Sequence, residues 1–144
     1  MRIEARTGDL LSAREVYEIW RIRDAVFSVE QNCREPDVDG VDLRPDCTHL
    51  WIAAADGTIR SYLRTFLSGG VRKVGRVATV RDARGQGLSG RLVQDVLDRW
   101  GDAEIRLGAQ AYLEDWYGRF GFVTVGPHFE EAGIDHVPMS RTGH

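Results

Sequence analysis

Residues 81–90 read RDARGQGLSG, and three of them have the spacing Gly-x-Gly-x-x-Gly, namely Gly85, Gly87 and Gly90. The preceding segment, VRKVGRVATV, is rich in β-branched residues and predicts a strand. Apolar residues at helical spacing follow the glycines as far as Trp100 and predict a helix. Unpaired N–H groups and the dipole at a helix N-terminus favour an anion, and glycines let a phosphate approach the backbone. The stretch therefore predicts a phosphate-binding loop between a strand and a helix.

The same glycine spacing occurs in dinucleotide-binding domains, but the surrounding sequence argues against one. Such a domain needs an acidic residue about 20 residues further on, at the end of the next strand. Here that strand ends at Gln110, and hairpins rather than parallel strands are predicted before the loop. No Gly-Lys-Ser/Thr follows the glycines, which argues against a P-loop. An NAD-dependent oxidoreductase is therefore disfavoured.

The composition is that of an ordinary globular chain. It has 144 residues, 42% apolar and 28% charged, with a net charge of −3. This length suggests a single domain over residues 1–144. The negative net charge gives no basic field for nucleic acid, and the longest apolar run, LWIAAA, is too short to cross a bilayer. Without a signal-peptide pattern, we expect a cytoplasmic protein with no nucleic-acid or membrane partner.

The predicted elements follow one another in a mixed order. Ser12 and Glu15 form a capping box that starts a helix, Asp56-Gly57 indicates a two-residue hairpin, and Gly69-Gly70 marks another turn. After the glycine loop and its helix come a strand, a short helix and two strands, over AEIRLGAQ, AYLEDWYGRFG, FVTV and DHVPMS. This order predicts an α/β (α+β) fold with a central mixed, mostly antiparallel sheet flanked by helices.

Basic residues gather around the loop. Between residues 72 and 91 only one acid, Asp82, accompanies Arg72, Lys73, Arg76, Arg81, Arg84 and Arg91. In a chain of negative net charge this is a focused cationic region, which suits a ligand with several phosphates. The alternative interpretation is a solvated face with scattered arginines.

Several motifs carry a family resemblance. RVATVRDARGQGLSGRLV resembles motif A of the GNAT N-acetyltransferase superfamily, Gln/Arg-x-x-Gly-x-Gly/Ala, with Arg84, Gly87 and Ser89 at the marked positions. AQAYLEDWYGRFGF resembles its later motif, in which Gln110 is followed by Tyr117 and then by Gly-Phe. IRDAVFSVEQ and FEEAGIDHVPM match the ElaA-like group of this superfamily. The matches cover most of residues 15–139, in order and at matching spacing.

The resemblance implies acetyl-CoA as the cosubstrate and a sheet splayed between its fourth and fifth strands. The backbone at Val77, Ala78 and Thr79 is expected to pair with the pantetheine arm, which Gln110 should also contact. The loop around the pyrophosphate is expected to comprise Arg84, Gly85, Gln86, Gly87, Leu88, Ser89 and Gly90. Ser89 stands where the family prefers Gly or Ala, and whether it weakens binding stays open.

The resemblance also places Tyr117 near the thioester sulfur. A tyrosine has a reference pKa near 10, so it is protonated at pH 7 and can give a proton to the leaving thiolate. Periodicity alone would make Tyr117 a core aromatic beside Trp116 and Phe120. Some relatives carry a catalytic Glu on the fifth strand, but position 105 is Ile here.

Three residues are candidates on the substrate side, where a base would help. Glu30 could face the acceptor pocket, or be an ordinary carboxylate at a helix end. His49 and His136 could titrate near neutrality, or be hydrogen-bonded strand residues.

The segment from Glu30 to Asp46 is acidic. It holds Glu30, Glu35, Asp37, Asp39, Asp42 and Asp46 against two arginines. It could attract a cationic amine, or be a solvated turn-rich loop. Its partial likeness to a calcium loop breaks at several positions, and the two cysteines have no metal spacing, so we expect no metal.

These observations predict an acetyl-CoA-dependent N-acetyltransferase. It would transfer the acetyl group to a primary amine of a small-molecule or peptide acceptor, by direct attack in a ternary complex. The alternative is an acyl-CoA-binding or regulatory module without turnover. The sequence does not determine the oligomeric state, although small chains of this kind often form homodimers.

Overall fold

The computed structural model describes residues 1–143, and His144 lies outside the described residues. The strands are β1 (Ile3–Thr7), β2 (Thr48–Ala53), β3 (Ile59–Ser68), β4 (Val71–Thr79), β5 (Ile105–Gln110), β6 (Val123–Thr124), β7 (Phe129–Glu131) and β8 (Ile134–Arg141). The α-helices are α1 (Ala13–Arg23), α2 (Leu88–Trp100) and α3 (Glu114–Gly118). Shorter helical segments are η1 (Gly8–Leu10), the π-helical η2 (Asp24–Glu30), η3 (Arg81–Ala83) and η4 (Ala111–Leu113).

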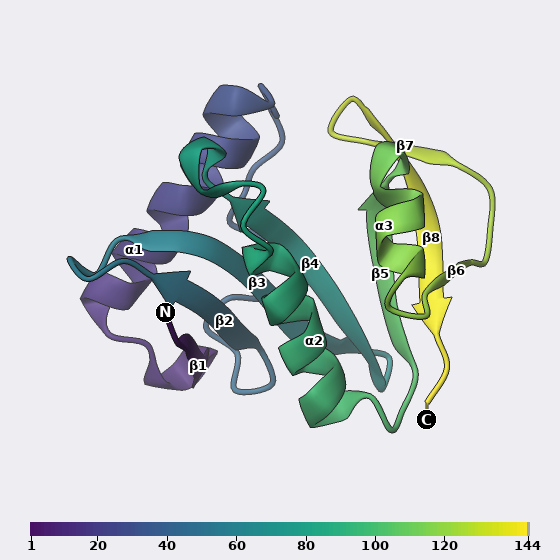
Figure 1. Cartoon of the computed structure of the whole chain (residues 1–144), viewed down its shortest axis with the longest axis horizontal. Coiled ribbons are helices and arrows are strands. Elements are labelled where there is room, and N and C mark those ends of the chain that lie inside the picture. The colour runs from purple at the N-terminus through teal and green to yellow at the C-terminus, as the bar shows by residue number, and fades with distance from the viewer. Residues whose placement is uncertain (144) are drawn as a thin grey trace.

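The eight strands form one sheet, in the order β1-β2-β3-β4-β5-β8-β6, with β7 also paired to β8. Among the described residues, β4 and β5 are the one parallel pair, and α2 makes the crossover between them. This confirms the predicted mixed, mostly antiparallel sheet. Helix α1 lies against one face of the sheet, and α2 and α3 lie against the other (Figure 1).

The core has two halves because side chains alternate along each strand. On β2, Leu50 and Ile52 point to the α2 side, whereas Trp51 points to the α1 side. Helix α2 fills the first half with its apolar stripe, Leu88, Leu92, Val93 and Val96. Helix α1 fills the second with Ile19 and Ile22, followed by Val26 of η2. Both helices were predicted from this periodicity, and Ser12 and Glu15 form the predicted capping box.

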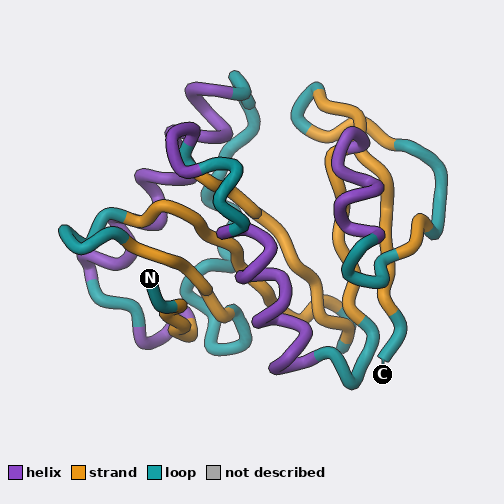
Figure 2. The backbone as a smooth tube through the Cα atoms, viewed as in Figure 1, coloured by secondary structure: helices purple, strands orange, loops and turns teal. Residues whose placement is uncertain are grey.

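The sheet splits between β4 and β5. The two strands pair only over Arg72–Val74 and Ile105–Leu107. Beyond Val74, the β4 backbone bulges opposite Leu63, and Arg76 adopts a φ of 53°. Figures 1 and 2 show the strands diverging from this short junction. The predicted splay between the fourth and fifth strands is therefore confirmed.

Some elements differ from those predicted. Strand β1, whose residues IEART are all half-buried, and the three-residue strand β7 were not predicted from the sequence. The Asp56-Gly57 hairpin is longer than predicted, because Ala54 N–H bonds Thr58 O and leaves three residues between them. Gly57 takes φ 88° and closes a turn on Ala54 O. Within the described residues, no helix has the length and apolar character needed to span a bilayer.

Candidate functional site

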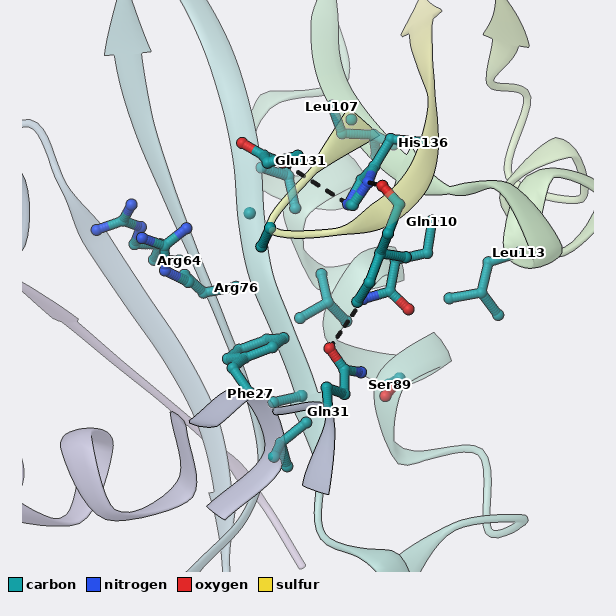
Figure 3. Close-up of a pocket in the computed structure, with 18 of the residues that line it drawn as sticks. Phe27, Gln31, Arg64, Arg76, Ser89, Leu107, Gln110, Leu113, Glu131 and His136 are labelled. Carbon is teal, nitrogen blue, oxygen red and sulfur yellow. Dashed lines mark hydrogen bonds and ion pairs between the residues drawn. The ribbon is translucent and has the colours of Figure 1, made fainter. Parts of the chain in front are cut away.

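A cavity of about 1330 Å³ lies where β4 and β5 separate. Its walls come from η2, from the β4 edge with the loop before α2, from β5 with the η4–α3 segment, and from the β7–β8 hairpin. Figure 3 shows side chains from these walls facing a common space. Segments distant in sequence therefore meet at one site.

The loop Arg84–Gly90, which we term the glycine cradle, forms one end of this cavity. Gly85 and Gly87 adopt φ values of 79° and 75°, and a Cβ added at either would meet no atom within 4 Å. The first N–H of α2 to bond within the helix is that of Arg91, which donates to Gly87 O. The amides of the first turn are thus free of helical partners, as an anion site at a helix N-terminus requires. Gln86 is exposed and does not line the cavity.

The edge of β4 forms a second wall. Val77, Ala78 and Thr79 line the cavity and lie beyond the last residue of β4 that pairs with β5. The edge that faces β5 is therefore open to another extended chain. On the opposite wall, Gln110 at the end of β5 donates from Nε2 to Gln31 Oε1 at 3.1 Å, across the gap between the two halves of the sheet (Figure 3).

Ser89 has a specific structural role. Its Oγ lies 2.5 Å from Thr79 Oγ1, which lies 2.8 Å from Ser61 Oγ. This hydroxyl chain ties the first turn of α2 to β4 and β3. The Ser89 side chain therefore points toward the sheet and leaves the backbone N–H on the cradle side.

Arg84 is held by Glu30. Its two terminal nitrogens donate to the Glu30 carboxylate at 2.6 and 2.7 Å, and its Nε donates to Thr79 O. This pairing lowers the pKa of Glu30, so Glu30 is a poor base near neutral pH.

The predicted cationic region is less focused than expected. Arg72 stacks on Trp100 at 4.1 Å from the ring centroid, and Arg76 pairs with Asp37 and Asp39. Neither contributes a free charge at the cradle. Of the two arginines just before the glycines, Arg81 and Arg84, Arg81 is the less tightly paired. Its side chain is 79% exposed, and its terminal nitrogen lies 3.6 Å from Glu30 Oε2. Backbone amides, more than side chains, thus make the cradle suited to an anion.

Tyr117 lies in the wall formed by α3. It is only 5% exposed, yet it lines the cavity. Its ring packs edge-on against Trp116 and Phe122. Burial raises its pKa, so the phenol stays protonated well above neutral pH. It is both the core aromatic expected from periodicity and a donor bordering the cavity.

Comparison with known proteins agrees with this arrangement. The family model described as an acetyltransferase (GNAT) domain matches residues 42–142. The chain belongs to the GNAT acetyltransferase family. A UPF0039 protein of Mycobacterium tuberculosis is 45% identical over 137 residues, which cover 92% of this chain and 88% of that protein.

Two crystal structures share this GNAT fold over nearly their whole length. An acyl-CoA N-acyltransferase from Pseudomonas aeruginosa has 37% identity and a TM-score of 0.89, covering 98% of this chain and 99% of its own. Escherichia coli ElaA has 34% identity and a TM-score of 0.87, with the same coverage. The resemblance to the ElaA-like group of GNAT proteins is thereby confirmed.

The acidic segment of this GNAT chain is largely exposed, as the solvated-loop alternative expected, but most of its carboxylates are engaged in ion pairs and are not free to attract a cation. Three of its aspartates alternate with three arginines in a closed set of ion pairs, the Asp–Arg ring, which comprises Arg23, Asp42, Arg64, Asp39, Arg76 and Asp37. Each carboxylate bridges two guanidinium groups. Asp46 pairs with Arg44, and Glu30 pairs with Arg84. Within the described residues, Glu35 is the acid of this segment with no ion-pair partner.

The ring positions the segment that follows η2, which forms part of the cavity wall. Arg23 and Arg64 are 0% and 2% exposed, and they attach the segment that follows η2 to α1 and β3. Arg76, at the bulge of β4, attaches the same segment to the splayed edge. Sequence reasoning missed this role, because nothing in the spacing of these residues indicates which aspartate meets which arginine.

His49 lies outside the cavity. It is 0% exposed, with Nδ1 bonded to Tyr62 Oη at 2.6 Å and Nε2 to Asp42 O at 2.8 Å. Burial lowers its pKa, which keeps it neutral. The structure therefore removes His49 from the substrate candidates, because its ring is enclosed by its hydrogen-bond partners on the α1 side of the sheet.

Asp42, Cys47 and His49 bring potential metal-ligand atoms within 4.8 Å of one another. A cation there would meet two guanidinium groups, because Asp42 Oδ1 already accepts from Arg23 and Arg64. Burial raises the pKa of the Cys47 thiol to about 12, which disfavours the thiolate that a metal needs. The cluster is a hydrogen-bond network, not a good metal centre.

His136 does line the cavity. It stands on β8 directly opposite Gln110 of β5. Figure 3 shows its ring beside Glu131 and facing the open space, across from Arg64 and Arg76. The structure thus brings together the cradle, the β4 edge, Gln110, Tyr117, Glu30 and His136.

Proposed function

We propose that the protein transfers an acetyl group from acetyl-CoA to a primary amine of a small molecule or peptide, by direct attack in a ternary complex. One observation carries the proposal: an open strand edge and a helix N-terminus with free amides border the same cavity. A ligand such as CoA, with an extended pantetheine arm that ends in phosphates, needs these two features side by side.

The chain's own groups fit acetyl-CoA in a definite order. The amides of the glycine cradle suit the pyrophosphate, and Arg81 adds an exposed charge nearby. The open edge of β4 at Val77–Thr79 suits the amides of the pantetheine arm, with Gln110 opposite. The thioester supplies the electrophilic acyl carbon. Because Ser89 turns its side chain to Thr79, its presence in place of Gly or Ala is compatible with this fit.

Tyr117 suits the role of proton donor to the leaving sulfur. Its hydroxyl makes no hydrogen bond to another side chain in residues 1–143 and belongs to a residue that lines the cavity. Its raised pKa keeps the proton in place until a thiolate forms.

The acceptor must lose a proton before it attacks. A lysine-like amine has a pKa near 10.4, so about one molecule in 2,500 is neutral at pH 7. Forming the neutral amine therefore costs roughly 4.6 kcal/mol of free energy. A base on the acceptor side of the cavity would remove much of this cost.

The test has two separate parts. Calorimetry with CoA and with NADH measures the ligand, and binding of NADH without CoA would refute the proposal. Acetyl transfer is then measured across polyamines, amino sugars, amino acids and peptide N-termini. CoA binding without transfer to any amine, and without hydrolysis of acetyl-CoA, would favour the acyl-CoA-binding module instead.

The role of Tyr117 is tested with two matched variants. Tyr117→Phe should lower kcat about a hundredfold while the Kd for CoA stays unchanged, because only the proton donor is removed. Tyr17→Phe is the control, since Tyr17 is 65% exposed on α1. An unchanged kcat in Tyr117→Phe would remove Tyr117 from the role.

A further inference from the structure

The β7–β8 hairpin holds His136 at the cavity in a fixed orientation. Ala132 and Gly133 form its tight turn, with φ values of 54° and 78°. The ring of Phe129 stacks on the imidazole, with 5.5 Å between centroids and 27° between planes. Phe129 lies over Gly108 of β5, where an added Cβ would be 3.1 Å from the Phe129 ring. The imidazole is therefore confined between this ring and its own strand.

The hydrogen bonds of His136 determine its tautomer. Nδ1 lies 2.7 Å from the carbonyl oxygen of Ile134. A carbonyl only accepts, so Nδ1 must carry the proton and donate it. In the neutral ring the lone pair is then on Nε2. In the described part of the chain, the nearest ionisable partner of Nε2 is Glu131 Oε2, at 3.6 Å (Figure 3).

Most of the other carboxylates of the cavity are already engaged, and the one without an ion-pair partner among the described residues, Glu35, is exposed on the segment that follows η2. The carboxylates of Asp37 and Asp39 belong to the Asp–Arg ring, and that of Glu30 belongs to Arg84. The β5 side chain at position 105 is a fully buried Ile. The other titratable groups that line the cavity are Glu131 of β7, the tyrosines of the η4–α3 segment and Arg106 of β5, which pairs with Glu104. Arg64 and Arg76 lie on the far wall, and Lys73 of β4 and Cys33 also line the cavity.

From this geometry we infer that His136 is the general base of the transfer and that Glu131 stabilises the imidazolium it becomes. The inference rests on the proposed function. Nε2 accepts a proton from the acceptor ammonium, the amine nitrogen bonds to the acyl carbon, and the carbon–sulfur bond breaks. The nitrogen then loses its second proton to solvent, while the thiolate takes a proton from Tyr117, which is reprotonated from solvent. His136 releases its proton to solvent, so that one proton is produced in each turnover.

The orientation of Glu131 also bears on the acceptor. The Glu131 side chain is 58% exposed, and its carboxylate lies 3.6 Å from His136 Nε2. It can therefore act as the counter-ion of a protonated amine that approaches the base. The acceptor class that this pair favours is therefore an amine that arrives as its ammonium.

The main experiment compares His136→Asn with His128→Asn. Asparagine can keep a donor to Ile134 O where Nδ1 stood, but it has no group in place of Nε2. His128 pairs with Asp135 on the exposed surface and does not line the cavity. We expect kcat/KM at pH 7 to fall about a hundredfold or more in His136→Asn only, with an unchanged Kd for CoA.

Two further readouts separate a base from a structural residue. In the wild type, kcat should decrease toward acid pH because a protonated imidazole accepts no proton, and this limb should vanish in His136→Asn. Imidazole added to His136→Ala should restore part of the rate. Circular dichroism and thermal unfolding verify that each variant is folded, and if His136→Asn does not fold, His136→Gln replaces it.

The possible outcomes are distinct. A His136→Asn rate within threefold of wild type, or an unchanged pH profile, overturns the inference even where CoA binds. Hydrolysis of acetyl-CoA is measured in parallel, so that water can serve as the acceptor if none of the amines is acetylated. Binding of CoA with neither reaction in the wild type also overturns the inference, while the cofactor part of the proposed function survives.

Discussion

Glu30 and Arg84 form a bidentate ion pair, with distances of 2.6 and 2.7 Å, between residues 54 positions apart in the sequence. The pair joins the end of η2 to the start of the glycine cradle. It also assigns Glu30 a role that its sequence position did not reveal. Instead of accepting a proton, this carboxylate occupies an arginine that an incoming phosphate could use.

Replacement of Glu30 by Gln should therefore strengthen CoA binding. The change removes a negative charge beside the cradle and releases Arg84, so we expect the Kd for CoA to fall about fivefold, as for one exposed charge interaction. Calorimetry at two salt concentrations measures the effect, which should shrink as salt rises. Glu4→Gln is the control for net charge, because Glu4 lies on β1 and pairs with Arg2 and Arg6. A large loss of kcat at unchanged CoA affinity would instead make Glu30 the base.

The glycine cradle allows a matched test of position. Gly87→Ala and Gly70→Ala introduce the same methyl group at φ values of 75° and 80°, and neither new Cβ would meet an atom within 4 Å. Both should cost about 1 kcal/mol of folding stability. Only Gly87→Ala should weaken CoA binding, by about tenfold or more, because the methyl group occupies the approach to the helix amides. Equal CoA affinities would show that the cradle does not hold the phosphates.

The hydroxyl chain predicts a small effect for Ser89→Ala. Loss of the bond to Thr79 Oγ1 should cost about 1 kcal/mol in urea unfolding. The Kd for CoA should change by less than about threefold, since the Ser89 N–H remains. A much larger change in CoA affinity would mean that the hydroxyl itself contacts the ligand.

The Asp–Arg ring predicts a strong contrast between two Asp→Asn changes. Asp42→Asn leaves Arg23 and Arg64 short of a charged acceptor in the interior, which should cost about 3–5 kcal/mol of unfolding free energy. Asp46→Asn breaks a pair with Arg44 near the surface and should cost about 1 kcal/mol or less. Urea denaturation at neutral pH measures both, and similar costs would contradict a special role for the ring.

The ring also predicts the response to acid. The hydrogen bond from Arg64 holds the pKa of Asp39 well below its usual range. A lowered folded-state pKa gives stability that is present above the unfolded value, near 3.9, and lost as pH falls through the folded value. The free energy of unfolding should therefore drop below about pH 4, and Asp39→Asn should flatten this dependence. An equally steep decline in that variant would place the acid sensitivity elsewhere.

Local patterns in the sequence predicted local structure well. The capping box at Ser12, the stripe of α2 and the glycines before it depend on neighbours in the chain, and each lies where it was predicted. The mixed, mostly antiparallel character of the sheet followed from the order of the predicted elements, whereas the strand order itself was not predicted.

Long-range partners could not be predicted from a single sequence. Whether Asp39 attracts a substrate or binds Arg64 depends on how β3 meets the segment after η2, which no local spacing encodes. The same is true of Gln31 and Gln110, which meet across the gap between β4 and β5. His49 and His136 look alike in the sequence, and both point to the face of the sheet opposite α2. They differ in their strands, since β2 lies in the half of the sheet that α1 covers, whereas β8 lies beyond the gap between β4 and β5.

The Asp–Arg ring limits how the acceptor pocket could be redesigned. Each of its six members pairs with two others. A substitution of any one of them, made to change the specificity, would therefore leave its neighbours each short of one ion-pair partner. However, Glu35 and Pro36, which lie in the sequence between the end of η2 and Asp37, line the cavity without belonging to the ring. These two positions are where an engineer could vary the pocket and leave the attachment of the segment unchanged.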